Sequence, residues 1–172
     1  YLSVPAFYNY EKLQKNLTFK LSEDFKLNAT LLGSIEYRIL PSPNFEISNV
    51  ILKSGNDKNA FEFAVIKKMK VFIPVKKIYD QDQLKIKKII FYDSNFNINK
   101  KSFKYIKSYL KEEISKKKIK IKKSMFFFRD SESKKDAVAL SHIQSLTLFY
   151  DKKNNYNKIK LIGSIFNTKY DL

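Results

Sequence analysis

The apolar residues of this chain recur with two different periods. From residue 8 to 24 they lie three or four positions apart, which is typical of a helix with one apolar stripe. We therefore predict an N-terminal amphipathic helix, which either packs on a core or lies on a membrane surface. The stripe contains Tyr10, Leu13, Leu17 and Leu21.

From residue 25 to 98 the period changes to two, as in strands with one apolar face. Pro41 and Pro43 stop the first of these strands, because proline cannot donate to a strand ladder. A change of parity near Asn49 predicts a β-bulge. The clearest alternation covers 60–75, and a strand of that length would reach about 50 Å.

The second part of the chain contains a further helix and several more strands. Residues 99–115 have an apolar stripe at helical spacing, and 116–172 read as a β meander whose strands are joined by polar turns. Strands do not alternate regularly with helices, which argues against a parallel α/β sheet. We predict a single, mainly β domain with two helices (α+β), built on a long, twisted, antiparallel sheet curled into an open groove.

Composition adds a large positive charge and removes most site chemistry. The net charge is +17, and of the 34 basic residues only Arg38 and Arg129 are arginine, a bias typical of an AT-rich genome. The sequence has no cysteine, one histidine and three glycines, so a zinc site of the usual type and a glycine-rich phosphate loop cannot be built. We expect no enzyme activity, no metal and no cofactor.

The densest run of positive charge lies in 116–123. It alternates with Ile119 and Ile121, so it fits either a solvated strand face or a surface that contacts anionic lipid or nucleic acid. The candidate contacts with an anionic surface are Lys116, Lys117, Lys118, Lys120, Lys122 and Lys123.

The order of the motifs resembles the N-terminal region of AsmA-like envelope proteins. The likeness rests on a helix, a strand that starts at Gly33, a Pro-x-Pro corner at Pro41 and Pro43, and an apolar alternation that ends at Asn49-Val50. It continues through 64–75 and 84–90 and into the late strand pair at 143–148 and 158–163. The helix at 99–115 and the high lysine content depart from the family pattern.

The resemblance implies a periplasmic protein anchored in the inner membrane, with residues 1–7 as the end of the anchor of a larger chain. Such proteins have a groove with an apolar inner face that handles phospholipid or another envelope lipid during outer-membrane biogenesis. The groove residues that we expect here are Phe61, Phe63, Val65, Met69, Val71, Ile73, Leu84 and Ile86. The same face could instead pack as an ordinary core.

Two other functions stay open at this stage. One is a basic module that binds nucleic acid, although the scarcity of arginine disfavours it. The other is an envelope assembly scaffold that binds partner proteins through its sheet edges by strand addition.

Overall fold

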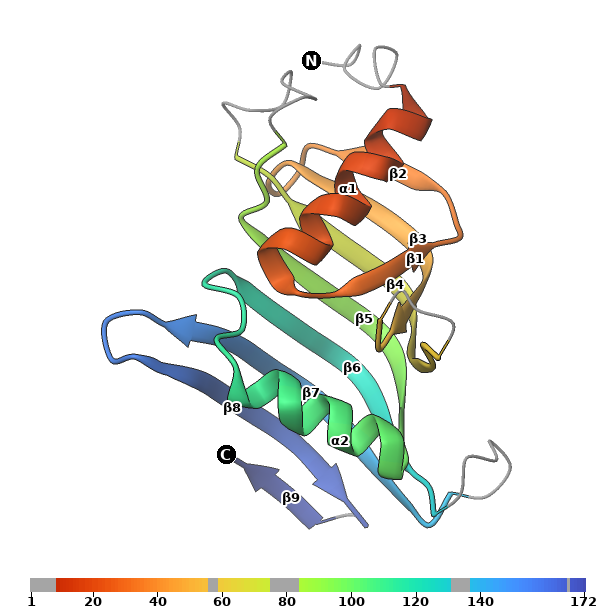
Figure 1. Cartoon of the computed structure of the whole chain (residues 1–172), viewed down its shortest axis with the longest axis vertical. Coiled ribbons are helices and arrows are strands. Elements are labelled where there is room, and N and C mark those ends of the chain that lie inside the picture. The colour runs from red at the N-terminus through yellow and green to blue at the C-terminus, as the bar shows by residue number, and fades with distance from the viewer. Residues whose placement is uncertain (1–8, 56–58, 75–83, 131–136, 167) are drawn as a thin grey trace.

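The computed structural model describes residues 9–55, 59–74, 84–130, 137–166 and 168–172 (Figure 1). The predicted anchor at 1–7 lies outside the described residues. The described part contains, in chain order, α1 (Tyr10–Phe25), β1 (Asn28–Leu31), β2 (Ile35–Arg38), β3 (Asn44–Lys53), β4 (Glu62–Phe72), β5 (Lys88–Ile98), α2 (Lys100–Lys111), β6 (Lys118–Phe128), β7 (Ala139–Asp151), β8 (Tyr156–Ile165) and β9 (Thr168–Asp171).

All the strands belong to one sheet that is not closed into a barrel. The order is β1-β3-β4-β5-β6-β7-β8-β9, and β2 pairs with β3 beyond the end of β1. Each neighbouring pair is antiparallel except β5 and β6. The prediction of a mainly β fold with two helices on a long, mostly antiparallel sheet is therefore confirmed.

The parallel pair explains the second helix, which departs from the AsmA-like pattern of the sequence. β5 and β6 run in the same direction, so the chain must return along the sheet between them, and α2 makes that return. β5 is one continuous strand from Lys88 to Ile98. From β6 to β9 the strands follow one another in sequence order, as a meander does.

Both helices lie on the same face of the sheet, which we call the inner face; the opposite face is the outer face (Figure 1). Apart from Tyr10, which is 55% exposed, the apolar stripe of α1 is buried in the main core, so this helix packs on the sheet as predicted for a core helix. The Asn9 side chain caps its first turn, and Lys26 ends it in a left-handed conformation. Its buried residues are Leu13, Leu17, Leu21 and Phe25.

The five central strands share one irregularity, a row of two consecutive residues that do not face the core. We call this the slip row; it consists of 48–49 in β3, 67–68 in β4, 92–93 in β5, 122–123 in β6 and 144–145 in β7. In each strand the residues directly before and after the two are buried, so the parity of the inner face changes there. Asn49, Asp93 and Lys123 have φ near 50°.

The slip expected near Asn49 is therefore present, but it is not a one-residue bulge. The pairs Ser48–Lys68 and Val50–Ile66 on either side keep the same register, because β4 slips at the matching position. A true shift of register between these strands occurs further on, where Phe63 is left without a partner between the pairs Leu52–Ala64 and Lys53–Glu62.

Candidate functional site

The two helices cover the inner face to different extents. The apolar stripe of α1 is sealed against the sheet, whereas Ser102 is the one residue of α2 that is fully buried. Phe103 of α2 is 58% exposed, and the remaining apolar side chains of that helix are half-buried. α2 therefore stands away from the sheet over part of its length.

The space beneath α2 forms a cleft of about 500 Å³, which we call the α2 cleft. Most of its walls come from α2 and from the inner face of β5 to β9; Leu27, Leu52 of β3 and Phe63 of β4 complete the lining. None of the described residues that line it carries a charge. Representative lining residues are Phe103 and Ile106 on α2, with Phe91, Phe126, Leu146 and Leu161 on the sheet.

Polar contacts hold α2 at its N-terminal end. Asn99 and Ser102 form a capping box, in which each side chain accepts from the backbone N–H of the other residue. The Ser102 hydroxyl also donates to the Asn97 carbonyl at 2.8 Å, which ties the first turn to the end of β5.

The C-terminal end of α2 is held by hydrogen bonds to distant elements. The Tyr109 hydroxyl donates to the Phe25 carbonyl of α1 at 2.8 Å. Asn157 of β8 donates to the Leu110 carbonyl at 2.8 Å and accepts from the Ile114 N–H at 3.1 Å. The helix is thus fixed at both ends, and the apolar cleft lies beneath it.

The few polar groups at the cleft are neutral hydroxyls. Burial raises the pKa of Tyr109, and the neighbouring Tyr105 adds to the shift; burial also raises the pKa of Tyr105. Both phenols therefore keep their protons at neutral pH. The hydroxyls of Ser141 and Tyr170 bond to each other. The cleft suits the uncharged, apolar part of a ligand.

Of the eight predicted groove residues, only Phe63 lines the α2 cleft. Phe61 is half-buried, with its ring edge-on to Tyr105 and 6.3 Å away between centroids. Val65 is 42% exposed on the outer face, so its assignment to the apolar face is wrong. Because β4 changes parity at 67–68, Val65 does not share a face with Met69 and Val71, although all three have odd numbers. The other five belong to the same buried core as the α1 stripe: Met69, Val71, Ile73, Leu84 and Ile86.

Sequence reasoning missed the residues that make most of the cleft. They lie on α2 and on β5 to β9, beyond the strand that shows the clearest alternation. The available signals were the stripe of the second helix and the aromatic residues Phe126 and Phe128, which share a parity in β6.

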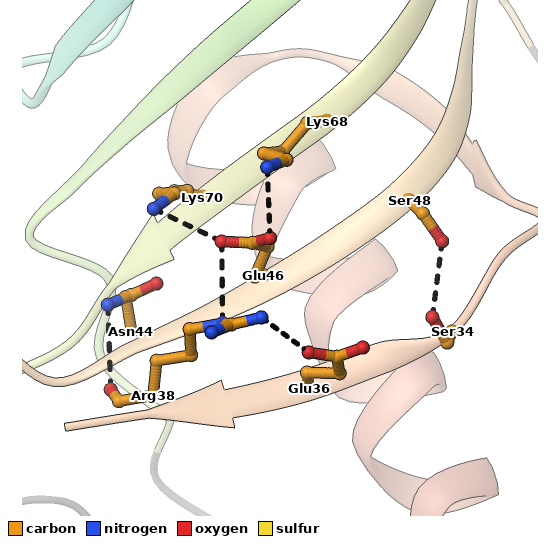
Figure 2. Close-up of polar contacts among 8 residues, drawn as sticks. All are labelled: Ser34, Glu36, Arg38, Asn44, Glu46, Ser48, Lys68 and Lys70. Atoms are coloured by element: carbon orange, nitrogen blue, oxygen red, sulfur yellow. Dashed lines mark hydrogen bonds and ion pairs between the residues drawn. The ribbon is translucent and has the colours of Figure 1, made fainter.

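The outer face has two differently charged regions. On β2 to β4, Glu46 is the centre of a network shown in Figure 2: its carboxylate lies 3.2 Å from Lys68 Nζ, 3.1 Å from Lys70 Nζ and 3.5 Å from Arg38 Nε. Arg38 also pairs with Glu36 at 2.8 Å. Burial alone would raise the pKa of Glu46, but Lys70 and Lys68 together lower it.

The predicted lysine run is divided between the two faces. Lys118, Lys120 and Lys122 alternate along the outer face of β6, next to Lys88 of β5. Lys117 forms an ion pair with Asp24 of α1 and lies over the Phe25 ring. Lys116, before β6, and Lys123, in the slip row, are both exposed.

Other kinds of site find no support in the described part of the chain. It holds no group of three histidine, cysteine or acidic residues that could bind a metal, and His142 is exposed on β7. Neither described helix has the length and apolar character needed to cross a membrane.

Comparison with known proteins adds no relative to this picture. No protein-family model matches the sequence, and no curated protein matches it either.

Proposed function

We propose that this chain is a non-enzymatic lipid-binding module that holds an acyl chain in the α2 cleft. The observation that carries the proposal is the difference between the helices: α1 seals its part of the inner face, while α2 leaves an uncharged apolar surface uncovered. Small-molecule sites are commonly apolar and about 300–1,000 Å³ in volume, and the α2 cleft falls within that range.

The energetics of an acyl chain favour this ligand class. Each methylene group moved from water into an apolar environment contributes about 0.8 kcal/mol. A cleft without charged groups supplies that environment and needs no covalent step. The hydroxyls of Ser141 and Tyr170, which both line the cleft, satisfy each other by a hydrogen bond and carry no charge.

The wider biological setting is part of the same proposal. The order of motifs resembles AsmA-like proteins, which supports a periplasmic, inner-membrane-anchored role in phospholipid transfer and outer-membrane biogenesis. The resemblance to AsmA-like proteins is clearest from α1 to β5, whereas the cleft lies mainly between α2 and β5 to β9. In this proposal the second half of the chain carries the lipid contact.

A charge placed in the cleft tests the proposal. Ile106 lines the cleft and Ser108 of the same helix is exposed, so Ile106→Glu and Ser108→Glu introduce the same side chain on opposite sides of α2. A glutamate that must lose water to make room for an acyl chain opposes binding. We expect Ile106→Glu to weaken binding of a fluorescent fatty acid at least tenfold, about 1.4 kcal/mol, and Ser108→Glu to leave it unchanged.

The measurement is a fluorescence titration of delipidated protein, with circular dichroism as the check that each variant is folded. Native mass spectrometry of the protein before delipidation should find co-purified phospholipid. Failure of the delipidated wild-type protein to bind the fatty acid would overturn the proposal. Equal weakening by both variants would also contradict it, because the effect would then not depend on the cleft.

A further inference from the structure

The outer face of β5 and β6 carries a compact group of lysines, which we call the lysine patch: Lys88, Lys118, Lys120 and Lys122. We propose that this patch docks the protein onto a membrane surface rich in anionic phospholipid headgroups. The inference does not depend on the α2 cleft, which lies on the inner face.

The parallel pairing of β5 and β6 brings these lysines together. Lys88 is in register with Lys118, and Tyr92 is in register with Lys122. Neighbouring strands are about 4.8 Å apart, and alternate residues of one strand are separated by about 6.6 Å. Four ammonium groups therefore share a small area, although Lys88 is 30 residues away from its partner Lys118 in the sequence.

The charge of the patch is not neutralised within the described part of the chain. None of the four lysines forms an ion pair there, in contrast to Lys68 and Lys70, which share Glu46. The pKa of Lys88 is lowered, first by burial and then by repulsion from the patch lysines and Lys87. The sheet thus holds like charges close together, which an external anion would relieve.

Apolar side chains lie beside and between the lysines of the patch. Lys88 Nζ lies 4.4 Å from the centroid of the Phe72 ring, and Lys118 Nζ lies 5.4 Å from that of Phe149. Ile90, only 5% exposed, is in register between Lys70 and Lys120, as expected where lysine stems cover an apolar side chain.

These features favour a membrane over a nucleic acid. Nucleic-acid recognition uses arginine forks and aromatic rings that stack on bases. The patch contains no arginine, and the rings of Phe72 and Phe149 already lie beneath ammonium groups. A diffuse anionic surface needs only point charges, and each lysine near it contributes about 1 kcal/mol.

Vesicle binding tests the inference on the whole chain. We expect the protein to co-sediment with vesicles of phosphatidylcholine mixed with phosphatidylglycerol, but not with phosphatidylcholine alone, and to be released by high salt. The variant Lys88→Gln, Lys118→Gln, Lys120→Gln, Lys122→Gln should lose at least tenfold in vesicle affinity.

The matched control removes the same charge elsewhere: Lys104→Gln, Lys107→Gln, Lys152→Gln and Lys153→Gln, all at exposed positions. It should retain most of the vesicle binding. Equal loss in both variants would overturn the inference, because net charge and not the patch would then determine binding. Loss of binding to a labelled single-stranded oligonucleotide in the patch variant, with vesicle binding unchanged, would also overturn it and assign the patch to nucleic acid.

Fatty-acid binding should be the same in both variants. Failure of the membrane-docking inference is therefore distinguishable from failure of the proposed α2 cleft.

Discussion

At the scale of single residues, Glu46 is the acidic centre of the outer face on β2 to β4. Its side chain is only 14% exposed and lies within ion-pair distance of Lys68, Lys70 and Arg38. The two lysines lower its pKa below the ordinary value of 4.5 despite partial burial. A depressed carboxyl pKa stabilises the fold above the ordinary pKa, and this contribution is lost as the pH falls through the folded-state value.

The first prediction concerns this carboxylate. Glu46→Gln should lower the free energy of unfolding by about 1.5 kcal/mol at neutral pH, because three cations lose their shared partner. Urea unfolding over a series of pH values measures the difference, which should shrink once the pH is below 4.5. Glu36→Gln is the control: Glu36 is 57% exposed, so its change should be close to zero. A constant difference down to strongly acidic pH would contradict the argument.

At the scale of elements, the slip row organises the sheet. Five strands change parity together, so their registers stay compatible and the inner face remains apolar on both sides of the row. Gly33, between β1 and β2, lies beside the row at Ser48, and its N–H donates to the Ser48 carbonyl at 3.1 Å. A Cβ at Gly33 would lie 2.4 Å from that carbonyl oxygen.

The second prediction follows from this close approach. Gly33→Ala should destabilise the protein by about 2 kcal/mol, since backbone atoms must move to admit the methyl group. Thermal or urea unfolding measures the change, and Ser34→Ala, at the next position, should stay within about 0.5 kcal/mol. Adding Ser48→Ala should not rescue Gly33→Ala, because the carbonyl oxygen remains. A Cβ at Gly33 would also lie 2.3 Å from the Ser48 hydroxyl oxygen, so full rescue would show that this hydroxyl is the only obstacle.

At the scale of the whole molecule, one sheet face carries two helices with different roles. α1 is part of the core, and Leu17, Leu21 and Phe25 are completely buried. α2 connects a parallel strand pair, is held at both ends and covers a cleft. Binding of an apolar ligand should therefore affect the two helices unequally.

The third prediction uses that inequality. Saturating fatty acid should slow amide hydrogen exchange in α2 and leave exchange in α1 almost unchanged, because only α2 gains packing contacts. Exchange measured by mass spectrometry with and without the ligand resolves the two helices. The Ile106→Glu variant serves as the control and should show no protection of α2. Equal protection of both helices would contradict a ligand site beneath α2.

The local pattern of the sequence determined much of the fold. Period-two alternation and the stripe of Leu13, Leu17 and Leu21 depend on neighbours along the chain, so they predict the mainly β class and the core helix α1. The polar turns of the last strands predict the meander for the same reason. The parity change at Asn49 was visible as well, since it interrupts a local repeat.

The tertiary structure alone decided the candidate site. The second parity change, at 67–68, removed Val65 from the apolar face, and the parallel pairing of β5 with β6 placed Lys88 beside Lys118. The sequence pattern of an amphipathic strand is the same whether a helix packs tightly on it or stands away from it. Sealing depends on contacts between residues far apart in the sequence, such as Asn157 with the end of α2, and local periodicity carries no information about them.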